Sequence, residues 1–260
     1  MKLARIFSLS LFAVILAGCV SADVAVCGDV SVQAGACVAV GEPAAAKPED
    51  FFVRRSLLCR QAFTEALTNL AAVTGRDASA LRGATIDGID ERLTNGVYAL
   101  KLNVVWSPER ETAAGAWLSK DAAAGKRASL NQARLEKVAG ITEWIGPKQI
   151  VDEKGGIHFL GFSAMAVGSN AMRSRMNIQR ATIEARGMAA RPFLGKDDKI
   201  KDAKCRFRRI YESRTKHPLC PEVEMYVCGF ELESIELPPQ TKAEVGTIVS
   251  KKEKSDETHK

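Results

Sequence analysis

The residues that could support acid–base or nucleophilic chemistry are few and widely spaced. Ser163 lies in the run Gly-Phe-Ser-Ala-Met, which approaches the Gly-x-Ser-x-Gly turn of the α/β-hydrolases but lacks its second glycine. His158 starts an apolar stretch, where we expect a satisfied core histidine or one at a strand edge. His217 precedes a proline between two cysteines, and we interpret it as a loop residue. The sequence therefore predicts no catalytic constellation.

Metal binding is a second chemistry that the spacing disfavours. His217 and Cys220 stand at a ligand-like spacing, but no second pair completes a tetrahedral site. Two pairs of carboxylates lack the spacing of a calcium loop, so we interpret them as solvated turn residues. They are Asp87 with Asp90 and Asp197 with Asp198. We expect no metal and no cofactor.

Cysteines are the most informative of the reactive residues. The chain has 7, and Cys19 at the end of the first apolar run is set apart from the others. An even number of remaining cysteines in an exported chain predicts disulfides, whose connectivity the sequence leaves open. Proximity favours a pair between the first two and some pairing among the last three, with free buried thiols as the alternative. These possible disulfide cysteines are Cys27, Cys37, Cys59, Cys205, Cys220 and Cys228.

The first residues have the build of a bacterial export signal. Two positive charges precede an apolar run over residues 6–17, which is shorter than the about 20 residues of a membrane-spanning helix. The run ends Leu-Ala-Gly-Cys at residues 16–19, which resembles the lipobox of bacterial lipoproteins. That resemblance implies lipid attachment, palmitate among the acyl groups, at Cys19 after cleavage behind Gly18. An ordinary signal peptide cleaved after Ala22 is the alternative.

The expected location follows from this motif. Several acyl chains on one residue would hold the protein firmly at a membrane. Val20 rather than Asp follows Cys19, and by resemblance to sorting in enteric bacteria this favours the outer membrane. We expect a lipid-anchored outer-membrane chain that faces the periplasm or the cell surface. A formal net charge of +6 is too mild for a nucleic-acid signature, and export argues further against a nucleic-acid partner.

The first half of the chain carries the clearest local signals. Apolar residues recur at helical spacing over about 52–74, and Gly75 follows as a C-cap. Asn95-Gly96 between two apolar runs predicts a type I′ hairpin turn, with a bulge at Gly88 in the first strand. The helix should cover the alternating inward face of the second strand, namely Tyr98, Leu100, Leu102, Val104 and Trp106.

The second half repeats the order of strand, helix and two strands. We expect a strand over 157–167, a helix from Ser169 or Asn170 to about 190, and strands near 205–211 and 222–235. The sequence therefore predicts an α+β fold of two small modules, each with antiparallel strands packed on one main helix. The expected ranges are a signal peptide at 1–18, a membrane-proximal tether with one or two short strands at 19–50, a first module at 51–108, a helical connector at 109–150, a second module at 151–239 and a disordered tail at 240–260.

One segment resembles a further lipoprotein family. The run Gly-Phe-Ser-Ala-Met-Ala-Val-Gly-Ser at 161–169, followed by an Arg/Ala-rich helix ending Ala-Arg-Gly-Met-Ala at 185–189, is similar to small envelope lipoproteins related to the flagellar-associated lipoprotein FlgP. The resemblance covers about 35 residues and implies an α+β fold and a role in envelope assembly or contact.

The expected function is therefore a structural, assembly or binding role in the cell envelope, without catalysis. The partners would be the membrane through the lipid anchor and an envelope protein or the cell wall. The alternative is a periplasm-facing hydrolase that uses His158.

Overall fold

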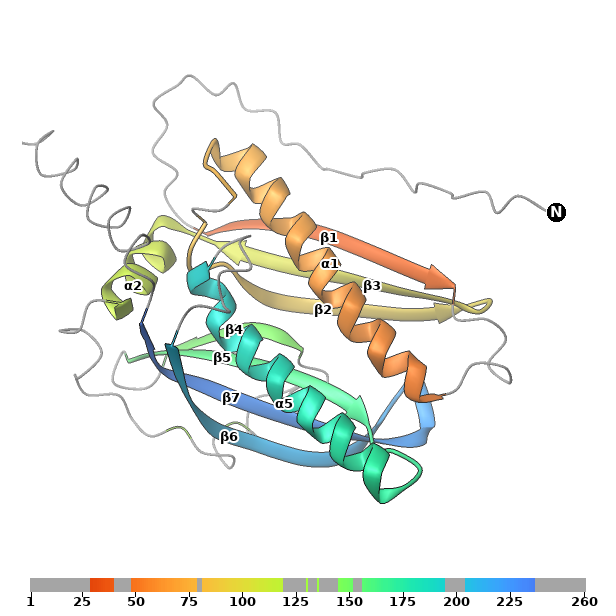
Figure 1. Cartoon of the computed structure of the whole chain (residues 1–260). Helices are drawn as coiled ribbons and strands as arrows, with labels where there is room; N and C mark the ends of the chain where they lie inside the picture. Colours follow the sequence, from red (N-terminus) through yellow and green to blue (C-terminus); the bar gives the residue numbers. More distant parts are fainter. Residues whose placement is uncertain are drawn as a thin grey trace, which may run out of the picture.

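The computed structural model describes residues 29–39, 48–78, 81–118, 130, 135, 145–151, 156–194 and 204–236, and shows the α+β class expected from the sequence. Two antiparallel sheets carry the helices α1 and α5 on the same side (Figure 1). The elements are β1 (Val30–Ala39), α1 (Pro48–Thr74), β2 (Thr85–Thr94), β3 (Val97–Trp106), α2 (Pro108–Leu118), β4 (Gly146–Val151), β5 (Ile157–Ala166), α5 (Ala171–Leu194), β6 (Lys204–His217) and β7 (Cys220–Glu236).

The first module is a three-stranded sheet covered by α1. Its strand order is β1-β3-β2, and the pairing of Leu93 with Tyr98 and of Thr94 with Val97 is the predicted register. The expected bulge lies between Ile86 and Gly88. The alternating side chains of β3 are buried under α1, because a strand with period two places them all on one face. These are Tyr98, Leu100, Leu102, Val104 and Trp106.

The second module is a four-stranded sheet in the order β4-β5-β7-β6, with α5 lying on it. Asn170 caps the helix as expected, since its Oδ1 accepts the amide of Arg173 at 2.9 Å. Small residues let α5 approach the sheet closely. A Cβ on Gly161 of β5 would overlap the backbone of Ala185 and Ala189. The strand therefore needs glycine at the point where the helix crosses it.

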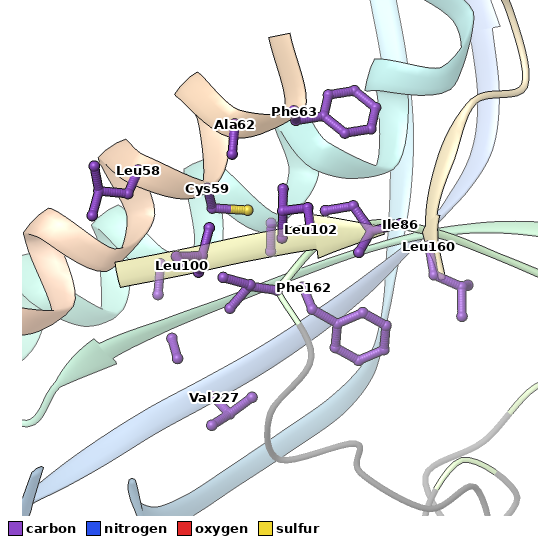
Figure 2. Close-up of a cluster of buried hydrophobic side chains, with 14 of the residues drawn as sticks. Leu58, Cys59, Ala62, Phe63, Ile86, Leu100, Leu102, Leu160, Phe162 and Val227 are labelled. Atoms are coloured by element: carbon purple, nitrogen blue, oxygen red, sulfur yellow. The ribbon is translucent and has the colours of Figure 1, made fainter. Parts of the chain in front are cut away.

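The two modules share one hydrophobic core. Figure 2 shows Leu58 and Cys59 of α1 with Leu102 of β3, and Phe162 and Val227 of the second sheet in the same cluster. The strand β2 also contacts β4, and α1 contacts strands of both sheets. Unfolding of one module would expose apolar surface of the other, and we expect them to fold as one unit.

Three boundaries differ from the sequence prediction. The sequence predicts a tether with one or two short strands over the range 19–50, but its strand β1 instead pairs with β3 along its whole length and so belongs to the sheet of the first module. The strand β4 lies in the predicted helical connector, and the Gly-Pro pair at 146–147 opens an edge strand, where a missing amide is tolerated. The helix α5 extends to Leu194, beyond the predicted end near residue 190, although Pro192 costs its last turn one backbone hydrogen bond.

The hairpin turn provides a test of the first module. Asn95 and Gly96 have φ values of 51° and 71°, as a type I′ turn requires. Replacing Gly96 with Val places a β-branched side chain in this region and should lower the free energy of unfolding by about 1–2 kcal/mol. Urea denaturation measures the loss. Asn95→Gly is the matched control and should stay within about 0.5 kcal/mol, since glycine adopts positive φ freely. A neutral Gly96→Val would contradict this turn.

Candidate functional site

A small cleft opens where the two modules meet. Residues of α1, β5 and α5 and the start of β4 line it, and its cavity volume is about 10 Å3. Pockets for drug-sized ligands measure roughly 300–1,000 Å3, so this cleft is far smaller and has room for about one water molecule. Its polar side chains are Arg55 and Ser56 of α1, Ser163 of β5 and Glu184 of α5. One of the reactive residues singled out in the sequence, Ser163, thus lines the cleft.

Glu184 is the polar centre of the cleft. Its carboxylate accepts hydrogen bonds from the hydroxyls of Ser163, at 2.7 Å, and of Ser56. Arg60 adds an ion pair at 3.6 Å from the more exposed side. Each hydroxyl thus donates its proton to an oxygen of this carboxylate rather than to a histidine. These contacts to Glu184 connect β5, α1 and α5, and they therefore join the two modules through polar interactions.

A second buried cluster is centred on Glu91 of β2. Arg55 forms a bidentate ion pair with it, at 2.6 Å from Nε and 2.7 Å from Nη2. The Tyr98 hydroxyl donates to the same carboxylate. His217, at the β6–β7 turn of the second module, lies 3.3 Å away through Nε2. Two strands of the first sheet, one strand of the second sheet and the main helix of the first module thus converge on one carboxylate.

The protonation states in this cluster follow from its contacts. Burial alone would raise the pKa of Glu91, but the hydrogen bonds and charge of Arg55 outweigh it and hold that pKa far below its usual range. The amide of Leu219 donates to Nδ1 of His217 at 3.2 Å, so Nδ1 is an acceptor and Nε2 is the donor that faces Glu91. His217 is 2 % exposed. It is also the last residue of β6 and pairs with Cys220, so the interpretation of this histidine as a loop residue is wrong.

A third cluster holds the other candidate histidine. His158 is fully buried, and its Nδ1 lies 2.7 Å from Glu231 of β7, which also pairs with Arg208. Burial would raise the pKa of Glu231, but hydrogen bonds from His158 and Arg208 lower it. His158 and Ser163 are five residues apart on β5, so they point to opposite faces of the sheet. The structure does not bring them together.

The described cysteines are free thiols. None of Cys37, Cys59, Cys205, Cys220 and Cys228 is bonded to another. The predicted pairing among the last three is wrong, because Cys205 lies at the start of β6 opposite Ile235, whereas Cys220 is the first residue of β7 and Cys228 lies in the middle of that strand. Burial raises the pKa of the Cys59, Cys220 and Cys228 thiols to about 12, which keeps them protonated and unreactive.

Two further candidates from the sequence, a metal site and the turn carboxylates, fall partly within the described residues. No group of three or more His, Cys, Asp and Glu side chains in the described ranges could hold a metal ion. Asp87 sits at the β2 bulge, and its carbonyl accepts a hydrogen bond from Lys148 of β4 at 3.3 Å. Burial lowers the pKa of Lys148 to about 8. Cys19, Cys27, Asp197 and Asp198 lie outside the described residues.

The surface carries a different kind of candidate site. Most of the strongly exposed large apolar side chains are isolated, but three of the described ones share α5. Met172, Met176 and Ile183 are 73 %, 58 % and 62 % exposed. Scattered surface apolar residues need no explanation, but a group on one helix does. No helix in the described ranges has the length and apolar composition needed to cross a bilayer.

Comparison with known proteins bears on the fold. A scan against protein-family models and a search of curated proteins gave no match. Among solved structures, the chain is similar to the crystal structure of the hypothetical protein FTT1539c from Francisella tularensis, with a TM-score of 0.53. The two sequences are 11 % identical, and the similarity covers 78 % of this chain and 83 % of that one. At this identity the comparison supports the α+β fold over most of the chain.

Proposed function

We propose that this chain is a membrane-anchored bacterial envelope lipoprotein whose folded part has a structural, assembly or binding role. The anchor would be a lipidated Cys19, and the location the outer membrane. The observation that carries the non-catalytic role is the separation of the candidate reactive groups. Ser163 and His158 face opposite sides of β5, and each is hydrogen-bonded to a different carboxylate. The hydrolase alternative has no such geometric support.

The folded part is suited to a binding role in two respects. Its core joins both modules, so it can present a surface of fixed shape. Its exposed large apolar residues concentrate on α5 rather than in the small cleft. The resemblance to lipoproteins related to FlgP implies a role in the envelope, which agrees with this proposal. The partner would be a protein or the cell wall.

Lipid attachment is tested by metabolic labelling with an alkyne fatty acid in a bacterial host. We expect the wild-type chain to take up the label and to sediment with membranes. Cys19→Ser should lose the label and keep its signal peptide, because the sulfur that accepts the lipid is gone. Cys37→Ser is the matched control, since this exposed cysteine lies on β1, and it should behave as wild type. Equal labelling of Cys19→Ser and wild type would contradict the proposal.

A further inference from the structure

The outer face of α5 has an unusual order of side chains. An α-helix turns by about 100° per residue, so Met172, Met176 and Ile183 fall within an arc of about 40° around the helix axis. This arc lies on the side of α5 that faces away from the sheet, which we call its outer pole. The helix buries its small residues on the other pole, at Ala181, Ala185 and Ala189. A solvated helix normally turns its polar residues farthest from the core. Here the most exposed pole is apolar.

Arginines flank this apolar pole on both sides. Arg180 and Arg173 lie on one side, and Arg175 and Arg186 on the other. Arg186 also stacks on Phe230 of β7, with its Cζ 4.9 Å from the ring centroid. The remaining described residues offer no carboxylate partner to Arg175 or Arg180. The lone acidic residue of α5 is Glu184, which is turned inward to Ser56 and Ser163.

The other main helix provides an internal comparison. In the first module α1 occupies the position that α5 has in the second (Figure 1). Its outward pole is mainly polar, with Gln61, Thr64 and Thr68 beside the exposed Leu57. The group of three exposed apolar side chains on the outward side is therefore found on α5 and not on α1.

We propose that the outer face of α5 binds the surface of an anionic phospholipid bilayer. Helices of this pattern lie in the membrane interface, with the apolar side chains entering the headgroup boundary and the arginines contacting phosphates. A symmetric contact with a second copy through this face would set arginines against arginines, which disfavours it. The inference rests on the proposed function in one respect, because the anchor at Cys19 would keep the chain beside the bilayer.

The test is sedimentation with vesicles, using a chain that starts at residue 20 and so carries no acyl group but contains every described residue. We expect it to bind vesicles of phosphatidylcholine mixed with phosphatidylglycerol, and to bind phosphatidylcholine alone weakly. Charge reversal of both Arg175 and Arg180 to Glu should weaken binding by about twentyfold or more. The same reversal at Arg92 and Arg214, exposed on β2 and β6, is the matched control and should change binding by less than about threefold.

The outcomes separate the possible occupants. Replacing Met172, Met176 and Ile183 with Ser should also weaken vesicle binding while leaving the melting temperature unchanged, since all three are exposed. Equal binding to both kinds of vesicle, or an equal loss in the control pair, would overturn the proposal. So would dimerisation through α5, or a photocrosslinker at Gln179 that captures protein and no lipid. Failure of lipid attachment at Cys19 leaves this experiment unaffected.

Discussion

Replacing Glu91 with Ala should lower the free energy of unfolding by about 3–5 kcal/mol, because it leaves the guanidinium of Arg55 buried without its carboxylate. Arg55 is 1 % exposed and pairs with Glu91 through two hydrogen bonds. Tyr98 and His217 lose the same acceptor. Since His217 belongs to the second module, we expect a single cooperative transition that moves to lower urea concentration, with no separate unfolding of one module.

Two comparisons make this prediction specific. Asp90→Ala on the same strand removes a pair whose side chains are 51 % and 75 % exposed, and it should cost less than about 1 kcal/mol. Because the pKa of Glu91 is lowered in the folded chain, its contribution is full above about pH 4.3 and is lost as the pH falls through the folded value. The variant should therefore lose less stability in acid than the wild type. A Glu91→Ala effect as small as that of Asp90→Ala would contradict the buried pair.

Replacing Gly161 with Ala should cost about 3 kcal/mol or more. The added Cβ would overlap the carbonyl oxygen of Ala185 and the amide nitrogen of Ala189, so the helix must move away from β5. Movement of α5 would also pull Glu184 from the Ser163 hydroxyl. Thermal denaturation measures the loss of stability.

Gly187→Ala is the matched control on the same helix. An added Cβ there meets nothing within 4 Å, and alanine favours helix over glycine. We expect a gain of about 0.5–1 kcal/mol. If both substitutions had the same sign, the close approach of α5 to β5 would be wrong.

The sequence predicted the elements whose signals are local. The helix over 52–74, the Asn95–Gly96 turn and the burial pattern of β3 depend on periodicity and turn chemistry within a few residues, and the structure confirms them. The repeated order of strand, helix and two strands is also confirmed, because it too depends on local patterns in the sequence. Asn170 was recognised because a cap is defined by its immediate neighbours.

The sequence did not predict the contacts that join distant segments. Arg55 and Glu91 are 36 residues apart, and Glu91 and His217 are 126 apart. A signal was present nonetheless, because Arg55 lies on the apolar face of its helix and Glu91 pairs with Leu100 on the inward face of the hairpin. Opposite charges at two core positions predict a buried pair. The even count of cysteines led to a wrong prediction of disulfides, because a count says nothing about the distances between the thiols.

The central claim, that the chain is a lipoprotein, is tested most directly by mass spectrometry of the N-terminal peptide of protein purified from bacterial membranes. We predict a mature chain that begins at Cys19 and carries the added mass of a diacylglycerol and an amide-linked acyl group. A mature chain that begins at Asp23, after cleavage behind Ala22, and carries no lipid would contradict the account.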